Sequence, residues 1–385
     1  MKPRFTLLSM VLLLVPIALL ASVSLPAHAQ KFTDLYNFTG GSDGGGPYGG
    51  VIRDKTGTLY GTTRAGGDSN DGTVWKLSKG TETVLHSFSG SDGSAPFATL
   101  ATDASGNLYG TASTGGSSGY GTVFKLSSSG KFSTLYTFTG SSDGANPYSG
   151  LILDKNGNLY GTTAAGGTSG VGTVFKVNIK SKKETVLHSF AGGSDGAYPY
   201  YGNLLLDSKG NLYGNATIGG SSNDGVVWEI TAKGKEIILH SFTGGSDGAD
   251  PFEHSLAMDT KGNLYGTTEE GGANSLGIVF MVNIKSKKET VLYTFTGGSD
   301  GGEPSAGLVR ASNGTLYGTT QVGGANSAGV VFQLIGKKET VLHTFDGTDG
   351  SNPFAAPLLY VKGTLYGVTD FGGADGDGVV FSLKP

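Results

Sequence analysis

The residues best suited to chemistry lie in one short segment and in a pair that follows it. Asp250-Pro251-Phe252-Glu253-His254 places two carboxylates and an imidazole within five positions, and Glu269-Glu270 adds two more carboxylates. A histidine among carboxylates can ligate a divalent metal or take part in acid–base catalysis. The sequence therefore predicts Glu253, His254, Glu269 and Glu270 as candidate catalytic residues. It predicts Asp250, Glu253 and His254 as candidate metal ligands.

Aromatic side chains form a second candidate site. They follow a recurring proline at Tyr48, Phe97, Tyr148, Tyr200, Tyr201, Phe252 and Phe354. Aromatic faces beside carboxylates and amides suit the stacking of sugar rings. We take Tyr48, Phe97, Tyr148, Tyr200, Phe252 and Phe354 as candidate ligand contacts. Packing between neighbouring structural units is the alternative interpretation.

A third pattern is an Asp-Gly pair preceded by Ser or Thr. Its aspartates are Asp43, Asp92, Asp143, Asp195, Asp247, Asp300 and Asp349. Several carboxylates together could bind Ca²⁺, a hard cation that takes six to eight oxygen ligands. The same pair also suits an Asx turn with glycine at positive φ, which is a structural role. No other cofactor is predicted.

Histidine alternates with tyrosine at one recurring position. His86, His188, His240 and His343 stand where Tyr36, Tyr136 and Tyr293 stand elsewhere in the chain. Both side chains combine an aromatic body with a polar tip. The exchange predicts packing with a hydrogen-bonding tip, and not proton transfer.

All of these patterns belong to one repeat. Leu-Tyr-Gly recurs with its tyrosine at 60, 109, 160, 213, 265, 317 and 366, at spacings of 49 to 53 residues. Each copy carries a Gly-Gly pair six residues after that tyrosine. The fifth copy departs most from the others, because Glu269-Glu270 replaces Ala-Ala, Ser-Thr or Gln-Val. A site grafted onto a repeat would show as such a departure. Drift of unselected loops is the alternative.

The third copy displays the secondary structure of the unit. It predicts strands at 151–153, 158–163, 173–177 and 184–190, with a tight turn at 154–157. No segment has a helical apolar period, and glycine makes up 68 of the 385 residues. Seven such units predict an all-β, seven-bladed β-propeller with four antiparallel strands per blade. An open β-solenoid is the competing architecture.

The order of strands predicts how the ring closes. Residues 34–38 read as a fourth strand with no first three before it. The last copy supplies strands at 357–360, 364–369 and 378–383 and no fourth. Pairing the two would remove two exposed sheet edges. We therefore predict that residues 32–38 pair with residues 378–383, so that the N-terminal strand completes the last blade.

The copies resemble a known family. The series GNLYGTT, GG, GTVFK, ETVLHSF and GGSDGA resembles the GloVer (Gloeo-Verruco) tandem repeats of exported bacterial proteins, over residues 32–385. The resemblance implies a β-propeller of uncharacterised function. Members of that family often carry C-terminal surface-anchoring signals, and the ending Phe381-Ser382-Leu383-Lys384-Pro385 departs from that pattern. The turn D-x-x-G-N-L-Y also resembles NHL-type propellers.

The first residues read as a secretory signal. Lys2 and Arg4 precede an apolar run, and Ala27-His28-Ala29 has the small-x-small cleavage pattern. We expect a signal peptide at 1–29, a propeller domain at 30–385, and a secreted or periplasmic protein without a membrane span. Cleavage removes two of the 27 basic residues, against 31 acidic ones, which disfavours nucleic acid as a partner. Cysteine is absent, so disulfides and cysteine chemistry are excluded.

The expected topology also sorts the charges. Loops between first and second and between third and fourth strands share one face, which is rich in lysine. The other loops share a face rich in carboxylates. The sequence therefore predicts a binding or interaction module for a glycan or an extracellular protein, acting through its acidic face. An extracellular lyase or hydrolase with its site in the fifth copy and a purely structural repeat protein are the alternatives. Oligomeric state is not predicted.

Overall fold

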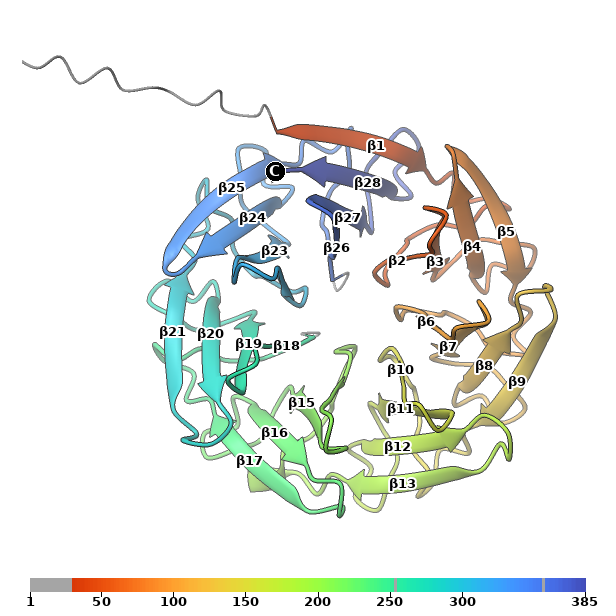
Figure 1. Ribbon diagram of the computed structural model, residues 1–385, viewed down its shortest axis with the longest axis horizontal. Coiled ribbons are helices and arrows are strands. Elements are labelled where there is room, and N and C mark those ends of the chain that lie inside the picture. Colours follow the sequence, from red (N-terminus) through yellow and green to blue (C-terminus); the bar gives the residue numbers. More distant parts are fainter. Residues whose placement is uncertain (1–29, 253–254, 355–356) are drawn as a thin grey trace, which may run out of the picture.

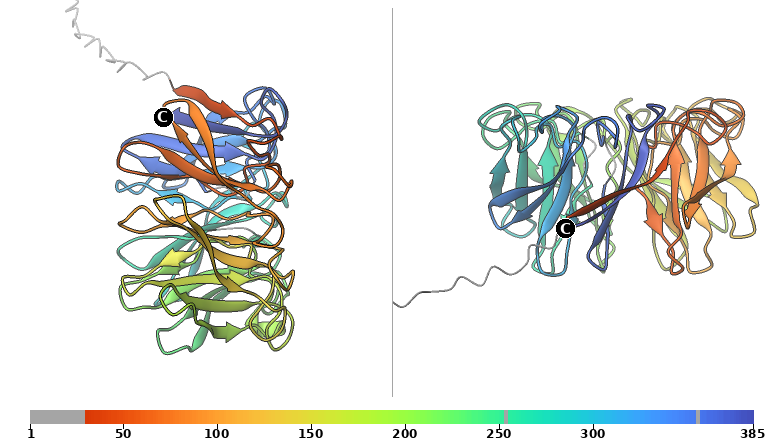
Figure 2. Two further views of the ribbon diagram at one scale, coloured as in Figure 1. Left: turned by 90° about the vertical axis from the view of Figure 1, so that its right-hand side faces the viewer. Right: turned by 90° about the horizontal axis from the view of Figure 1, so that it is seen from above.

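Seven four-stranded antiparallel sheets form a closed ring (Figure 1). This computed structural model describes residues 30–252, 255–354 and 357–385. In six sheets the strands follow chain order from the central axis to the outer rim, and in the seventh the N-terminal strand lies outermost, so the structure is the predicted seven-bladed β-propeller. Seen from the side, the blades make a thick disc (Figure 2).

The strand bounds repeat from blade to blade. Blades 1 to 3 contain β2 (Ile52–Arg53), β3 (Leu59–Thr63), β4 (Thr73–Ser78) and β5 (Thr81–Ser87); β6 (Ala101–Thr102), β7 (Leu108–Ala112), β8 (Thr122–Leu126) and β9 (Phe132–Thr137); β10 (Ile152–Leu153), β11 (Asn158–Thr163), β12 (Thr173–Asn178) and β13 (Glu184–Ser189). Blades 4 to 6 contain β14 (Leu205–Leu206), β15 (Leu212–Ala216), β16 (Val226–Ile230) and β17 (Glu236–Ser241); β18 (Ala257–Met258), β19 (Asn263–Thr268), β20 (Ile278–Asn283) and β21 (Glu289–Thr294); β22 (Val309–Arg310), β23 (Leu316–Thr320), β24 (Val330–Ile335) and β25 (Lys338–Thr344). Blade 7 contains β26 (Leu359–Val361), β27 (Thr364–Thr369), β28 (Val379–Lys384) and β1 (Lys31–Asn37), and one 3₁₀ turn, η1 (Gly193–Asp195), precedes blade 4.

The first strand of each blade is shorter than predicted. It has two residues in blades 1 to 6 and three in blade 7, where the sequence analysis expected three or four. The strands converge on the axis here, and the chain leaves the sheet to turn into the loop that carries the recurring proline. The second strands of the third and last copies, at 158–163 and 364–369, have the predicted bounds.

Strand β1 closes the ring as predicted. It pairs antiparallel with β28 from Lys31↔Lys384 to Asn37↔Val379, and the Phe38 N–H donates to the Gly378 carbonyl at 3.0 Å. The N-terminal strand is therefore the outermost strand of the last blade (Figure 1). The pairing covers the outer edge of β28, which would otherwise invite association, and β1 becomes the rim strand of the blade.

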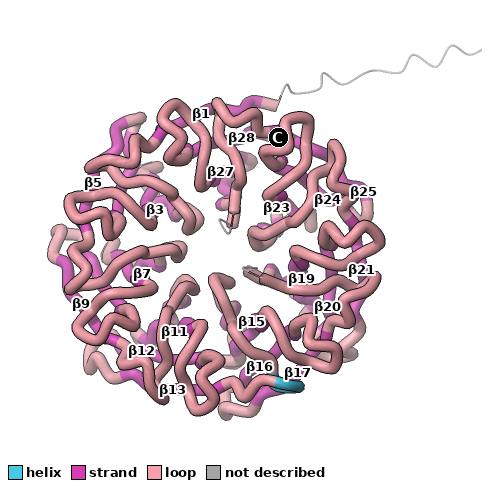
Figure 3. The backbone as a smooth tube through the Cα atoms, turned by 180° about the vertical axis from the view of Figure 1, so that it is seen from behind, coloured by secondary structure: helices cyan, strands magenta, loops and turns pink. Residues whose placement is uncertain are grey.

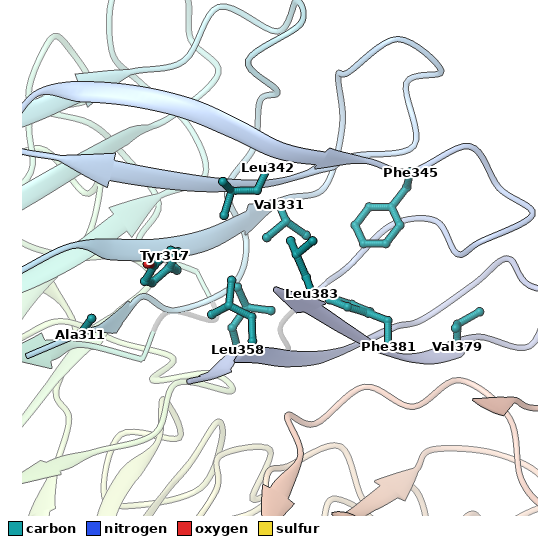
Figure 4. Packing of buried hydrophobic residues seen from close by; sticks show 10 residues of the cluster. Ala311, Tyr317, Val331, Leu342, Phe345, Leu358, Val379, Phe381 and Leu383 are labelled. Carbon is teal, nitrogen blue, oxygen red and sulfur yellow. The ribbon is translucent and has the colours of Figure 1, made fainter. Parts of the chain in front are cut away.

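The hydrophobic core lies between blades as much as within them. Figure 4 shows one such cluster, in which Val331, Leu342 and Phe345 of blade 6 pack against Phe381 and Leu383 of blade 7. Each interface between blades repeats this arrangement. Stability is therefore shared around the ring and depends on each blade having two neighbours.

The glycine of the Leu-Tyr-Gly motif has a packing role. In blade 3, a Cβ atom on Gly161 would lie 2.8 Å from the ring of Phe175 on the neighbouring strand and 3.0 Å from Leu151. Phe175 is fully buried. The edge of the aromatic ring of the third strand thus fills the space beside the second strand, and any side chain at the glycine would displace it.

The recurring aspartates tie the outer strand to the loop that follows it. The Tyr36 hydroxyl donates to Asp43 Oδ2 at 2.9 Å, and His86 Nε2 lies 2.9 Å from Asp92 Oδ2. Equivalent pairs are Tyr136–Asp143, His188–Asp195, His240–Asp247, Tyr293–Asp300 and His343–Asp349. The exchange of His and Tyr therefore preserves a polar tip, as predicted. The expected Asx turn is wrong, because the carboxylate accepts from backbone N–H groups upstream of it, such as Thr39 N at 3.0 Å.

Each pair meets a side chain of the next blade, and we call the resulting group a rim cluster. In five clusters this side chain is a glutamate whose Oε1 is buried without a hydrogen-bond partner: Glu82, Glu184, Glu236, Glu289 and Glu339. In the other two it is a phenylalanine stacked on the histidine, Phe132 on His86 at 3.8 Å and Phe32 on His343 at 3.7 Å between ring centroids. Burial, then the neighbouring aspartate, raises the pKa of Glu82, Glu184 and Glu339 to about 7.

These glutamates predict that the protein is more stable in mild acid than at neutral pH. A carboxyl group with a raised pKa in the folded state favours folding fully below its unfolded pKa near 4.5, and this contribution is lost as pH rises to about 7. Replacing Glu82, Glu184 and Glu339 by glutamine should reduce the decrease in the free energy of unfolding between pH 5 and 8. Urea midpoints measured against pH test this. An unchanged slope in the triple variant would contradict it.

Candidate functional site

The loops that join second to third strands and successive blades gather on one face, which we call the mouth face (Figure 3). Here the predicted aromatic residues meet around the axis. Ring centroids lie 4.9 Å apart for Tyr48 and Phe97, 5.4 Å for Phe97 and Tyr148, and 5.3 Å for Tyr48 and Phe354. The other contacts in the ring are Tyr148–Tyr200 at 5.9 Å and Tyr200–Phe252 at 5.4 Å. The six candidate ligand contacts thus form one aromatic ring around the axis, which is open at blade 6, where Ser305 follows the proline.

Tyr201 fills the centre of this ring. Its centroid lies between 4.7 and 5.7 Å from those of Tyr48, Phe97, Tyr148 and Phe252. Its φ of 39° lies in the left-handed region, so the backbone is held in a conformation that non-glycine residues rarely adopt. The central channel is therefore floored by aromatic side chains on its mouth face.

A polar arc borders this floor on blades 5 to 7. In each blade the residue before the proline accepts a backbone hydrogen bond from the residue that follows the second strand. The N–H of Glu269 donates to the Asp250 carbonyl at 3.0 Å, and that of Gln321 to the Glu303 carbonyl at 3.0 Å. Asp370 donates in the same way to Asn352 at 3.3 Å. In blades 2 to 4 the residues at these positions are Ala95 and Ser113, Asn146 and Ala164, and Tyr198 and Thr217.

Two carboxyl groups of the arc have pKa values above the usual range for carboxyl groups. Burial raises the pKa of Asp250 to about 6, with a further contribution from Glu270 and Asp224. Burial, followed by repulsion from Asp250, Glu303 and Glu270, raises the pKa of Glu269 to about 7. A group that changes charge near neutral pH can act as a general acid or base.

Several buried acceptors in the arc have no hydrogen-bond partner. They are Asp250 Oδ1, Gln321 Oε1 and Asn352 Oδ1. The buried Ser305 Oγ is also unpartnered, and Ser305 follows Pro304 where the other blades carry an aromatic residue. An unpaired buried polar group is costly, so this cluster of acceptors favours a ligand that brings donors.

The arc ends at an ion pair across the closing seam. Arg64 of blade 1 donates to Asp370 of blade 7, with Nε to Oδ1 at 3.0 Å and a nitrogen of the same guanidinium to Oδ2 at 3.3 Å. Asp370 is 5% exposed, and its burial raises its pKa even though Arg64 acts in the opposite direction. This pair fixes the two end blades to each other at the mouth.

The predicted catalytic and metal residues are only partly brought together. Asp250 and Glu269 lie side by side in the arc, and Glu270 is exposed next to them. Glu253 and His254 lie outside the described residues. Gln321, Asn352 and Asp370 were not singled out from the sequence, and Tyr201 was noted among the recurring aromatic residues but not as a ligand contact. Their signal was available, because each occupies the same repeat position as Asp250 or Glu269, or adds a second aromatic to a copy.

A groove lies on the opposite face, between blades 3 and 4. It has a volume of about 700 Å³ and is lined by Leu206, Tyr160 and lysines such as Lys155 and Lys209. Its carboxylate Asp154 is fully used within its own turn, accepting from Asn156 N, Asn158 N and the Tyr160 hydroxyl. We therefore place the candidate site at the mouth, where acceptors are unpaired.

Comparison with known protein families identifies the family of this chain. The model of the Gloeobacter/Verrucomicrobia repeat matches residues 22–205 and again residues 200–385. The chain belongs to the Gloeobacter/Verrucomicrobia repeat family. The resemblance noted in the sequence is thereby confirmed. No curated protein matches this Gloeobacter/Verrucomicrobia repeat protein in sequence.

Solved structures share the fold of this Gloeobacter/Verrucomicrobia repeat protein at low identity. The extracellular domain of BT4673 from B. thetaiotaomicron is 10% identical with a TM-score of 0.62, over 92% of this chain and 40% of that one. The chain thus spans about two fifths of that domain. Oligogalacturonate lyase from Vibrio parahaemolyticus is 12% identical with a TM-score of 0.56, over 93% and 94% of the two chains. Among the described residues, none forms a helix suited to crossing a membrane.

Proposed function

We propose that the protein is an exported glycan-binding module whose ligand docks on the mouth face. The observation that carries the proposal is the coincidence of an aromatic floor with three unpartnered buried acceptors, Asp250 Oδ1, Gln321 Oε1 and Asn352 Oδ1. Sugar hydroxyl groups supply the missing donors, and the C–H face of a sugar ring packs on an aromatic ring. The carboxylates of the arc favour a neutral or amino sugar over an acidic one.

Export to the periplasm or the cell exterior is part of this proposal. It rests on the signal sequence at 1–29, which lies outside the described residues. The likeness to an extracellular domain supports it.

The second candidate is a lyase or hydrolase with its site in blade 5. The observation that favours it is the neighbouring pair Asp250 and Glu269, with pKa values of about 6 and about 7. One carboxyl group of such a pair can donate a proton while the other accepts one. The fold likeness to oligogalacturonate lyase is in keeping with this candidate.

A polysaccharide panel distinguishes the two functions. Residues 30–385 are incubated with immobilised neutral, amino and acidic glycans, with and without Ca²⁺, and both retention and released products are measured. We expect retention of a neutral or amino glycan without turnover. Product release that is lost in Asp250→Asn or Glu269→Gln would establish the enzyme instead.

The aromatic floor gives a matched pair of variants. Phe97→Ala and Tyr148→Ala should each weaken binding about tenfold, as expected when a central aromatic contact is removed. Tyr120→Ala is the control, because Tyr120 is 46% exposed on a loop of the same face and makes no contact with the ring among the aromatic pairs of the described residues. Equal binding by all three variants would place the ligand elsewhere.

A further inference from the structure

The rim cluster between blades 3 and 4 differs in geometry from the other six, although His240, Asp247 and Glu289 form a cluster of the same residue types. Within the described residues, His188, Asp195 and Glu236 form the one group of three metal-ligating side chains whose ligand atoms all lie within 4.8 Å of one another. His188 lies in β13 and Asp195 in η1, both from blade 3 or the loop after it. Glu236 begins β17 of blade 4, and Figure 3 shows η1 beside that strand.

The spacing of the ligand atoms suits a tetrahedral metal ion. His188 Nε2 lies 3.2 Å from both Asp195 oxygens and 3.6 Å from Glu236 Oε1. Zinc bonds of about 2.0–2.2 Å to nitrogen and oxygen place neighbouring ligands about 3.3–3.5 Å apart. In the clusters where phenylalanine covers the histidine, the His–Asp distances are shorter, 2.9 Å for His86 and 2.7 Å for His343.

The loop before Asp195 lacks the hydroxyl group that donates to the aspartate in five of the other clusters. In the loops that follow blades 1, 4 and 7, for example, an upstream hydroxyl donates to Oδ1 of the aspartate, as Ser89 does to Asp92, Thr243 to Asp247 and Thr39 to Asp43. The equivalent position before Asp195 is Ala191, which has no hydroxyl and donates only its N–H, to Oδ2 at 2.6 Å. Asp195 Oδ1 therefore receives no hydrogen bond from a hydroxyl group, and its neighbour is His188 Nε2 at 3.2 Å.

Glutamate provides the third ligand and the charge balance. Glu236 Oε1 is buried without a hydrogen-bond partner, and the side chains of His188, Asp195 and Glu236 are 17%, 20% and 15% exposed. Two carboxylates balance the charge of a divalent cation, and a neutral imidazole completes a nitrogen–oxygen donor set that zinc accepts. The partial exposure leaves access from solvent and room for a water as fourth ligand.

We propose that His188, Asp195 and Glu236 bind Zn²⁺ and so connect blade 3 to blade 4 at the rim. The site is separate from the mouth face and does not depend on the glycan-binding proposal. A metal that binds the folded chain but not the unfolded chain stabilises the fold. Disulfides stabilise many exported proteins, and this chain has no cysteine to form them.

The test uses substitutions that the chain already carries at other rim clusters. Residues 30–385 are stripped with a chelator and titrated with ZnCl₂ by calorimetry. We expect one Zn²⁺ per chain and a higher melting temperature when it is bound. His188→Tyr, which recreates the clusters of Tyr36 and Tyr136, and Glu236→Phe, which recreates those of Phe32 and Phe132, should each weaken binding at least about 100-fold.

Two controls keep the result specific. His240→Tyr changes the neighbouring rim cluster, where Asp247 retains its hydroxyl partner Thr243, and should leave Zn²⁺ affinity unchanged. Ala191→Thr restores a hydroxyl next to Asp195 and should weaken binding without removing a ligand. Melting in chelator shows that each variant folds. No binding by the wild-type chain, or binding that persists in both His188→Tyr and Glu236→Phe, would overturn the proposal.

Discussion

Removal of residues 30–40 is expected to abolish cooperative unfolding of the ring. This segment contains β1, and its loss exposes the edge of β28 together with the core around Phe381. It also removes Phe38, which is fully buried, and Phe32, which packs on His343 and Phe381. Burying such a side chain is worth about 1.5–3 kcal/mol. Several of them together approach the whole stability of a typical domain, about 5–15 kcal/mol.

Thermal melting followed by circular dichroism measures the effect. The control chain begins at Gln30, and a second chain begins at Gly41. A peptide of residues 30–40 added to the shorter chain should restore part of the transition, because it can pair with β28 in the same register. Identical melting curves for the two chains would show that β1 does not hold the ring closed.

Arg64→Ala is expected to destabilise the protein by about 2–3 kcal/mol. Loss of one partner leaves Asp370, which is 5% exposed, as an uncompensated buried charge. The effect falls below that of a fully buried pair because the side chain of Arg64 is 33% exposed. Free energies of unfolding from urea titrations measure it.

A second substitution separates the charge from the packing of the arginine stem. Asp370→Asn in the Arg64→Ala background should recover about half of the loss, since the buried charge is then absent. The pKa of Asp370 is already raised, so the deficit of Arg64→Ala alone should shrink as pH falls and the carboxyl group gains its proton. A deficit that is the same in both backgrounds and at every pH would assign the effect to packing alone.

Strand order and closure could be predicted because they depend on local patterns that recur seven times. The second strand at 158–163 has alternating apolar residues and a tight turn before it, and these fix its bounds. The partner of β1 followed from counting strands. The length of the first strand did not follow, because it is set by the crowding of seven chains at the axis and not by the residues of any one copy.

The candidate site was only partly predictable. The sequence drew attention to Asp250 and Glu269 as departures from the repeat, and the structure places them together. Gln321 and Asn352 occupy the same repeat positions as Glu269 and Asp250, but neither residue type is unusual in a loop, so the sequence did not draw attention to them. Which residues of successive blades face one another depends on the rotation between blades, and that rotation has no local signature in the chain.

The contacts within the rim clusters could also be predicted only in part. The His–Tyr exchange indicated a polar tip, but its partner, an aspartate six or seven residues downstream, depends on how the loop folds back. The contact with a glutamate of the next blade spans about one whole repeat. One feature of the sequence does mark the Asp195 cluster: Ala191 has no hydroxyl group at a position where Ser or Thr stands in five other copies.

Tyr201 at the centre of the aromatic ring limits how many molecules the mouth face can bind. A position on a rotation axis can be occupied by a side chain from one blade only, and here Tyr201 of blade 4 takes it. Seven near-identical units therefore cannot present seven equivalent docking positions around the centre. A molecule that binds there meets an asymmetric surface, because the unpartnered acceptors all lie on blades 5 to 7, so we expect a single bound molecule in one orientation per ring.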